Sequence, residues 1–147
     1  MAVYCHPRHW NHNLSSSVLR AEVDEKVHLA LGCHPKQANL WNSSSSSKLE
    51  NALETLRPQL VALGECGLDY SEGSNVPKEQ QQKVFKQQIL LAMKLQLPLV
   101  LHIRDAEEDG LRVLEVAGLP EDWPVHRHCF TGSSLWELLI QCEHLPF

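Results

Sequence analysis

The chain has 147 residues, enough for one domain with a buried core, and its apolar content of 43% and charged content of 21% are normal for a globular protein. No apolar run approaches the roughly 18–20 residues that a membrane span needs, and the first residues lack the basic and apolar regions of a secretory signal. We therefore expect no membrane association and an intracellular location, in the nucleus or cytoplasm. The net charge of −5 argues against a broad basic surface for nucleic acid, although bound metal ions can supply positive charge for a phosphate substrate.

Short apolar runs alternate with segments of helical periodicity. The predicted strands are 2–5, 27–33, 60–64, 98–103 and 124–130, and the predicted helices are 14–23, 48–57, 77–97, 106–117 and one that begins near 134. Alternation of this kind, without hairpins, predicts an α/β fold with a parallel sheet and outer helices in a single domain over residues 1–147.

Local signals define several element ends. Capping boxes are predicted at Ser47 with Glu50 and at Asp105 with Glu108, and the serine tract 43–47 is interpreted as a flexible surface segment. Gly118 fits the position that follows a helix. The five cysteines are an odd number without a C-x-x-C pair, so we interpret them as reduced and structural.

Each predicted strand stops at a residue that can bind a divalent metal; in chain order these are His6, His34, Glu65, His102 and His128. Because parallel strands place their carboxyl ends at one edge of a sheet, the pattern points to a metal-dependent enzyme. A carboxylate with several histidines suits Zn, Mn or Mg.

Each of these residues also has an ordinary interpretation. Glu65 can bridge two cations, but it can equally cap a loop or pair with a lysine. His102 lies in an apolar run, where a hydrogen-bonded core histidine is the alternative to a ligand. Asp69 can orient a water or hold a ligand, or it can be a turn aspartate. The planar fork of Arg104 suits a phosphate, with an ion pair to Asp105 as the alternative.

The last of these strands adds a further ambiguity. His126 and His128 share one face of their strand, because side chains alternate, and Arg127 points the other way. One of the two histidines can be a ligand, or both can be ordinary.

Four segments, in this order, resemble the TatD family of metal-dependent deoxyribonucleases, and most closely its animal TatD-domain proteins. They are Gly-Cys-His-Pro at 32–35, Gly-Glu-Cys-Gly-Leu-Asp-Tyr at 64–70, Leu-His-Ile-Arg-Asp-Ala at 101–106 and His-Cys-Phe-Thr-Gly at 128–132. The resemblance is firm over residues 27–133. It implies a (β/α)8 barrel with two metals at the strand ends, which cleaves DNA phosphodiester bonds, often from a 3′ end. The metals of such a site polarise the phosphate and activate water for in-line attack.

The resemblance also implies roles for individual residues. Glu65 matches the glutamate that bridges the metals, and His102 and His128 match histidines that hold the second metal. His34 and Asp69 match active-site positions near the substrate and the ligands. The resemblance thus implies a catalytic set of Glu65, Asp69, Arg104 and His34, metal ligands Glu65, His102 and His128, and substrate contacts through Arg104 and His34.

The sequence also departs from the family. It lacks the early Asp-x-His-x-His strand and the late Thr-Asp-x-Pro strand, both of which supply metal ligands. A barrel needs eight strands and about 250 residues. We therefore expect a partial TIM-type (β/α)8 barrel of about five βα units, without the first and the last two strands, as a splice form, a degraded gene copy or a partial gene model would give.

Several expectations follow from a partial barrel. The chain should bind one divalent metal or none, show weak or no activity on a DNA substrate, and be able to self-associate through its open sheet edges. The alternatives are a related metal-dependent hydrolase of small esters or amides, and a non-catalytic fragment that binds a partner.

Overall fold

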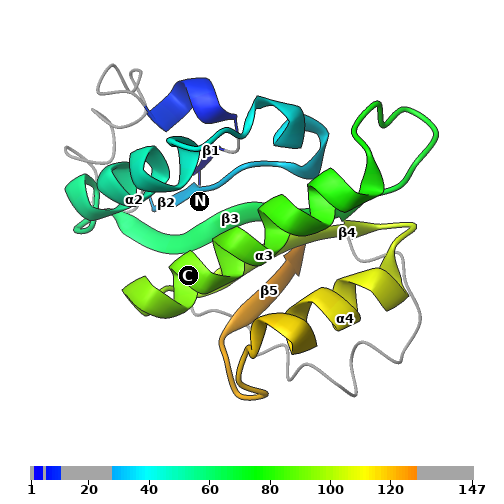
Figure 1. The fold of residues 1–147 in the computed structure, drawn as a ribbon. Coiled ribbons are helices and arrows are strands. Elements are labelled where there is room, and N and C mark those ends of the chain that lie inside the picture. The colour runs from blue at the N-terminus through cyan, green and yellow to red at the C-terminus, as the bar shows by residue number, and fades with distance from the viewer. Residues whose placement is uncertain (1, 5, 11–27, 129–147) are drawn as a thin grey trace.

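The structure is a computed structural model that describes residues 2–4, 6–10 and 28–128 (Figure 1). Its five parallel strands form one sheet in sequence order: β1 (Ala2–Tyr4), β2 (Leu29–Leu31), β3 (Leu60–Asp69), β4 (Leu99–Arg104) and β5 (Val125–His128). The helices are the 3-10 helices η1 (Pro7–Trp10) and η2 (Pro35–Leu40) and the α-helices α2 (Ser45–Thr55), α3 (Lys78–Leu95) and α4 (Glu107–Ala117). Each strand pairs with the next strand described in the chain, which is the order of a (β/α) barrel wall.

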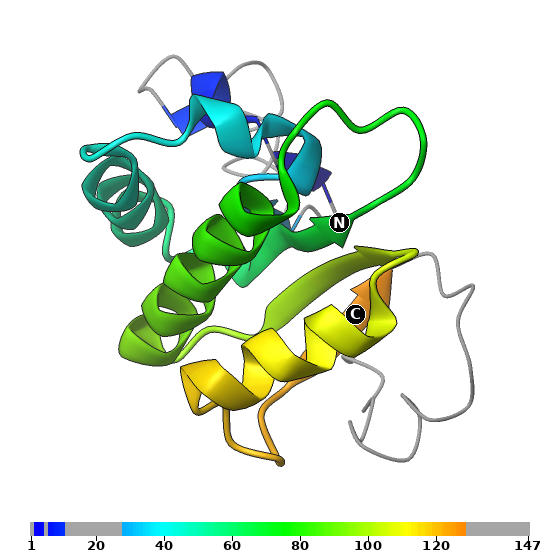
Figure 2. The same ribbon diagram turned by 45° about the vertical axis from the view of Figure 1, so that its right-hand side comes forward.

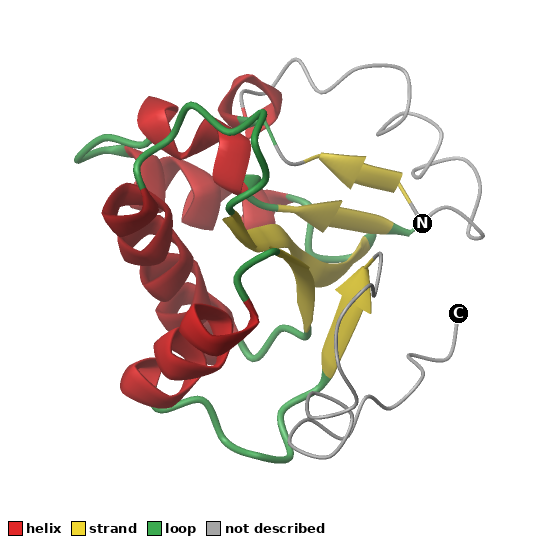
Figure 3. Ribbon diagram, turned by 90° about the vertical axis from the view of Figure 1, so that its right-hand side faces the viewer, coloured by secondary structure: helices red, strands yellow, loops and turns green. Residues whose placement is uncertain are grey.

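The three α-helices cover one face of this sheet (Figure 3). Helix α3 crosses its middle, with α2 and α4 on either side (Figure 2). The main core fills the space between helices and strands, and its fully buried members include Phe85, Leu63 and Leu101. A small second cluster of Ala30, Ala62 and Val100 lies apart from it. The result confirms the predicted partial TIM-type barrel.

The predicted order of strands and helices is confirmed for the described residues, with two differences in extent. Strand β2 is shorter than predicted, and β3 continues to Asp69, five residues beyond the predicted end at Gly64. Neither of the 3-10 helices, η1 and η2, was predicted. The predicted helices at 14–23 and 134–147 lie outside the described residues.

Both predicted capping boxes are wrong. Helix α2 begins at Ser45, because Asn42 Oδ1 accepts a hydrogen bond from Ser44 N and forms a turn within the serine tract. Ser45 is buried, and its Oγ accepts a hydrogen bond from Asn42 N, so the tract is not a loose surface segment.

The predicted cap of α4 differs in the same way, because its N-cap is Ala106. The φ of Asp105 is 52°, and it is Glu107 Oε2 that accepts a hydrogen bond from Ala106 N. The prediction at the other end of α4 is confirmed: Gly118 has a φ of 73° and ends the helix.

Among the residues described, no helix is both long enough and apolar enough to span a bilayer. Cys33 and Cys66 are both buried, and Cys66 is a free cysteine, as predicted; burial raises the pKa of Cys66 so that it stays a thiol. The other three cysteines lie outside the described residues.

Candidate metal centre at the strand ends

Glu65 reaches the site because β3 is irregular at this residue. In the pairing of β3 with β4, Gly64 lies opposite Val100 and Cys66 opposite Leu101, so Glu65 is an extra residue between two paired ones. A bulge of this kind re-aims a side chain that regular alternation would send to the other face. It lets Cys66 and Leu68 remain in the core beneath the helices while Glu65 is only partly buried.

The same pairing aligns the histidines of the two following strands. His102 of β4 lies opposite Gly67 of β3 and opposite His128 of β5. A Cβ built on Gly67 would lie 2.1 Å from the carbonyl oxygen of His102, and the φ of Gly67 is 142°. Only glycine therefore allows β3 to approach His102 so closely.

Asp69 and His102 form the buried centre of the cluster. The Asp69 side chain is 1% exposed, and its Oδ2 lies 3.0 Å from His102 Nε2. Oδ1 accepts hydrogen bonds from the Ser71 backbone N and from the Ser71 hydroxyl. Burial by itself raises the pKa of Asp69, but the Ser71 hydrogen bonds, His102 and the nearby Lys36 outweigh it and lower this pKa to about 2. Asp69 is therefore an anion at neutral pH, as a metal site or a histidine partner requires.

His34 stands beside this pair at the start of η2. Its ring centroid is 4.4 Å from that of His102, and its Nε2 lies 3.9 Å from Glu65 Oε2. Its Nδ1 accepts a hydrogen bond from Lys36 N, which is an N-cap interaction. A ring nitrogen that accepts a hydrogen bond carries no proton, so the neutral ring holds its proton on Nε2. Burial, followed by the neighbouring His102, lowers the pKa of His34 to about 4, which agrees with a neutral ring.

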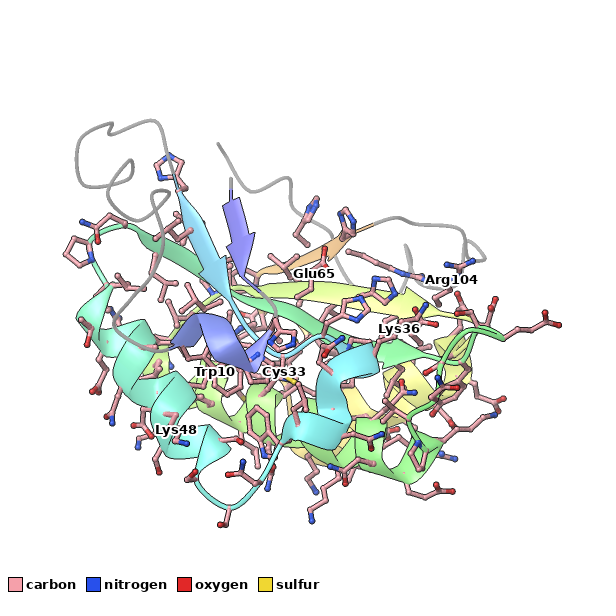
Figure 4. All side chains as sticks on the ribbon, turned by 90° about the horizontal axis from the view of Figure 1, so that it is seen from above. Trp10, Cys33, Lys36, Lys48, Glu65 and Arg104 are labelled. Carbon is pink, nitrogen blue, oxygen red and sulfur yellow. The ribbon has the colours of Figure 1, made fainter. Side chains whose placement is uncertain are left out.

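The outer part of the site is more open. His128 Nε2 lies 3.4 Å from Glu65 Oε1, and the His128 side chain is 48% exposed. Arg104 ends β4 opposite Asp69 and is exposed. Lys36 Nζ lies 3.4 Å from Asp69 Oδ2. Figure 4, seen from above, shows Glu65, Lys36 and Arg104 directed to the same region of the molecule.

Two buried glutamines of α3 hold the ends of the site strands. Gln88 Oε1 accepts a hydrogen bond from Cys33 N, and its Nε2 donates to Cys33 O, one residue before His34. Gln81 does the same for Asp69, accepting from its backbone N and donating to its backbone O. The two glutamines are seven residues apart, or two helical turns, so they face the sheet together.

The donor set fits a divalent cation. His34, Asp69 and His102 each offer a ligand atom, and these atoms lie within 4.8 Å of one another. Imidazole nitrogens with carboxylate oxygens are ligands that zinc and manganese accept. The carboxylate–histidine pair of Asp69 and His102 also matches the way proteins orient a ligating histidine.

Comparison with known proteins agrees with this geometry. Residues 2–140 match the family model described as TatD related DNase. The chain belongs to this family.

Relatives of the chain in the TatD family are named as nucleases. A human protein named 3'-5' RNA nuclease TATDN2 is 43% identical over 131 residues, which cover 88% of this chain and 16% of the human protein. A protein from Erwinia tasmaniensis named 3'-5' ssDNA/RNA exonuclease TatD is 40% identical over 102 residues, which cover 69% of this chain and 38% of the bacterial protein.

Solved structures of the family share the fold. The crystal structure of YjjV, a TatD homologue from Escherichia coli, superposes with a TM-score of 0.78 at 30% identity and covers 95% of this chain and 52% of its own. A TatD family hydrolase from Entamoeba histolytica has a TM-score of 0.74 at 22% identity, which is evidence for the fold alone. The chain thus spans about half the length, or less, of these relatives.

The structure brings the residues predicted for the site to one edge of the sheet, but it pairs them differently from the predicted metal set of Glu65, His102 and His128. His128 contacts Glu65, whereas His102 contacts Asp69. The individual roles of these residues, and of His34 and Arg104, stay predictions. His126 lies opposite Val100 and is exposed.

Three residues of the site were missed from the sequence. Lys36 follows His34 by two positions, and nothing in its neighbourhood distinguishes it from a surface lysine. Gln81 and Gln88 did carry a signal, because with Phe85 they form an i, i+4, i+7 series that places two amides on the apolar face of α3. A polar residue at such a position needs a buried partner.

Proposed function

We propose that this chain carries a metal-dependent centre of a TatD-type nuclease that hydrolyses phosphodiester bonds of nucleic acid. The observation that carries the proposal is the convergence of two carboxylates and three histidines on four consecutive pieces of chain at one sheet edge. The names of the relatives suggest single-stranded DNA or RNA as the substrate and a 3′ end as the starting point. The family resemblance adds DNA as the expected substrate.

Glu65, His102 and His128 are the proposed ligands, with Mg, Mn or Zn as the metal. Asp69 would hold the His102 ring in place through its hydrogen bond with Nε2. When bound, such a cation supplies Lewis-acid polarisation of a phosphate oxygen and activation of water. A second cation, as in the complete family site, would need ligands that residues 2–4, 6–10 and 28–128 do not gather in one place. One cation per chain is therefore our expectation.

His34 suits a substrate contact better than a metal ligand. Its Nδ1 is engaged by the Lys36 backbone, and the proton of the neutral ring sits on Nε2, the atom that faces Glu65. In this tautomer Nε2 can donate a hydrogen bond to a phosphate oxygen, and His34 would join Asp69 and His102 as a ligand only after Nε2 loses its proton. Arg104 is proposed as the second donor to the phosphate, through its planar guanidinium.

The test combines metal content with nuclease activity. The purified chain should bind about one Mn²⁺ or Zn²⁺ in a calorimetric titration, and Glu65→Gln should weaken that binding at least tenfold. Digestion of 5′-labelled single-stranded DNA and RNA should be slow, should shorten the strands from the 3′ end and should disappear in the variant. Absence of metal binding, or equal binding and digestion by Glu65→Gln, would refute the proposal.

The same assays separate the alternatives. Hydrolysis of p-nitrophenyl esters or anilides that depends on Glu65, with none of nucleic acid, would replace the nuclease by a small-molecule hydrolase. A stable complex on size exclusion that Glu65→Gln does not change would favour a non-catalytic binding role. Self-association through β1 and β5, the edge strands among the described residues, stays a prediction of the same experiment. An intracellular location, in the nucleus or cytoplasm, is part of the proposal and agrees with the free thiol of Cys66.

A further inference from the structure

Lys36 is a charged residue of the site that neither the metal ligands nor the predicted substrate contacts include. It lies in the first turn of η2, its side chain is 35% exposed, and its ammonium is 3.4 Å from Asp69 Oδ2. A Cβ built on Gly73 would lie 4.0 Å from Nζ, so the ammonium sits between η2 and the loop that follows β3. This position places a cation directly beside the carboxylate that holds His102, one of the proposed metal ligands.

The contact between Lys36 and Asp69 is loose. Charge-assisted hydrogen bonds between an ammonium and a carboxylate are usually about 2.7–2.9 Å long. Both oxygens of Asp69 already have other partners, namely Ser71 on Oδ1 and His102 on Oδ2. Asp69 therefore does not depend on Lys36 for its hydrogen bonds. The lysine side chain can move away without leaving a buried polar group unsatisfied.

The charges of the site give the lysine two opposite effects. Glu65 and Asp69 contribute two negative charges, Lys36 and Arg104 two positive charges, and the neutral His34 none. A divalent cation would therefore change the balance from zero to two positive charges, and only one positive charge would remain without Lys36. Lys36 thus opposes the metal by repulsion and favours the substrate by attraction.

Building on the proposed function, we propose that Lys36 is a further phosphate-binding residue of this site, beside His34 and Arg104, and that it competes with the metal for Asp69. With no metal bound, its ammonium neutralises Asp69. With metal bound, it swings from Asp69 to a non-bridging oxygen of the substrate phosphate. Its four-carbon stem and point charge suit such a movement, because they impose no fixed geometry on the partner.

The test uses Lys36→Met, which keeps the length of the side chain and removes the charge. Lys48→Met is the matched control: Lys48 is an exposed lysine of α2, on the opposite side of the molecule from Glu65 (Figure 4). Mn²⁺ affinity is measured by calorimetry, and binding of a fluorescein-labelled oligothymidylate by anisotropy in Ca²⁺. Lys36→Met should bind Mn²⁺ about three- to tenfold more tightly and the oligothymidylate about three- to tenfold more weakly. The slope of the logarithm of the oligothymidylate binding constant against the logarithm of the salt concentration should decrease by about one, which corresponds to the loss of one phosphate contact.

Lys36→Arg should restore oligothymidylate binding, and Lys48→Met should change neither affinity by more than about twofold. The inference is overturned if Lys36→Met leaves Mn²⁺ affinity unchanged or lowers it, or if oligothymidylate binding falls no further than in Lys48→Met. Glu65→Gln tells the two proposals apart. If it abolishes Mn²⁺ binding while Lys36→Met has no effect, the metal centre stands and only the role of Lys36 is refuted. If the wild-type chain binds no Mn²⁺, both proposals are refuted.

Discussion

The inner and outer parts of the site are built in different ways. Asp69 and His102 are hydrogen-bonded to each other, and the end of the Asp69 strand is fixed from behind by Gln81 of α3. His128, on β5, is 48% exposed and meets Glu65 at 3.4 Å. The comparison shows that the inner part is fixed before any ligand arrives, whereas the outer part is open to solvent and substrate. Changes to the inner part should therefore alter folding, and changes to the outer part should alter binding alone.

The largest expected effect is that of Gly67→Ala. The added Cβ would lie 2.1 Å from the His102 carbonyl oxygen, at a φ of 142° that alanine rarely adopts, so β3 and β4 must separate. We expect the free energy of unfolding to fall by about 3–5 kcal/mol. Urea unfolding followed by circular dichroism measures this loss.

Gly118→Ala is the control for this prediction. Gly118 also has a positive φ, 73°, but a Cβ added there would have no atom within 4 Å, so only the backbone strain remains. We expect a loss of about 1 kcal/mol. Equal losses in the two variants would contradict the claim that close packing of β3 on His102 fixes the inner site.

Gln88→Met should have the second largest effect. The variant fills similar volume but removes both hydrogen bonds to the Cys33 backbone, at a fully buried position. Two buried backbone groups then lose this partner, so we expect a loss of about 2–4 kcal/mol in the same urea titration.

Gln87→Met is its matched control on the same helix. The Gln87 Oε1 atom is buried without a hydrogen-bond partner among the described residues, so methionine should be neutral or slightly stabilising, within about 0.5 kcal/mol. A loss in Gln87→Met as large as that in Gln88→Met would mean that the amide contact to the strand end contributes little.

The pH dependence of the stability of the metal-free chain tests the state of His34, which lies beside both His102 of the inner part and Glu65 of the outer part. The pKa of His34 is lowered from 6.5 to about 4, first by burial and then by His102, so between these values the unfolded chain binds the extra proton. The stability that neutral His34 contributes is complete above pH 6.5 and is lost as the pH falls toward 4, by about 2 kcal/mol. Between pH 6.5 and pH 4, the stability of His34→Gln should fall less than that of the wild type. The measurement is the midpoint of unfolding at each pH, in the presence of a metal chelator. Parallel pH profiles for the two proteins would show that His34 is not held in its neutral form.

The sequence was sufficient for the framework of the fold and for the residues that gather at the site. Apolar runs that are buried on both faces of the sheet, such as Leu99 to Leu101, are strong signals that tertiary contacts do not override. The bulge at Glu65 could not be read from the sequence, because it breaks the alternation on which strand prediction rests. The predicted caps of the helices that start at Ser45 and Glu107 were wrong for a related reason, since Asn42 and Glu107 accept the local hydrogen bonds in place of the expected capping residues.

The smallest effect on stability is expected for His128→Ala. Its side chain is nearly half exposed, so the free energy of unfolding should change by no more than about 0.5 kcal/mol. Mn²⁺ affinity should nevertheless fall at least tenfold, because a proposed ligand is lost. A variant that unfolds more easily but binds Mn²⁺ as the wild type does would reverse the distinction between inner and outer parts.

The central claim is that the strand ends hold a divalent cation through Glu65, His102 and His128. Crystals of the chain grown with Zn²⁺ and measured at the zinc absorption edge would test it directly. The account predicts an anomalous peak about 2.0–2.2 Å from a His102 ring nitrogen and a Glu65 carboxylate oxygen, with His128 completing the site. A map with no peak at this edge of the sheet, or with a zinc ion that none of the three residues contacts, would contradict it.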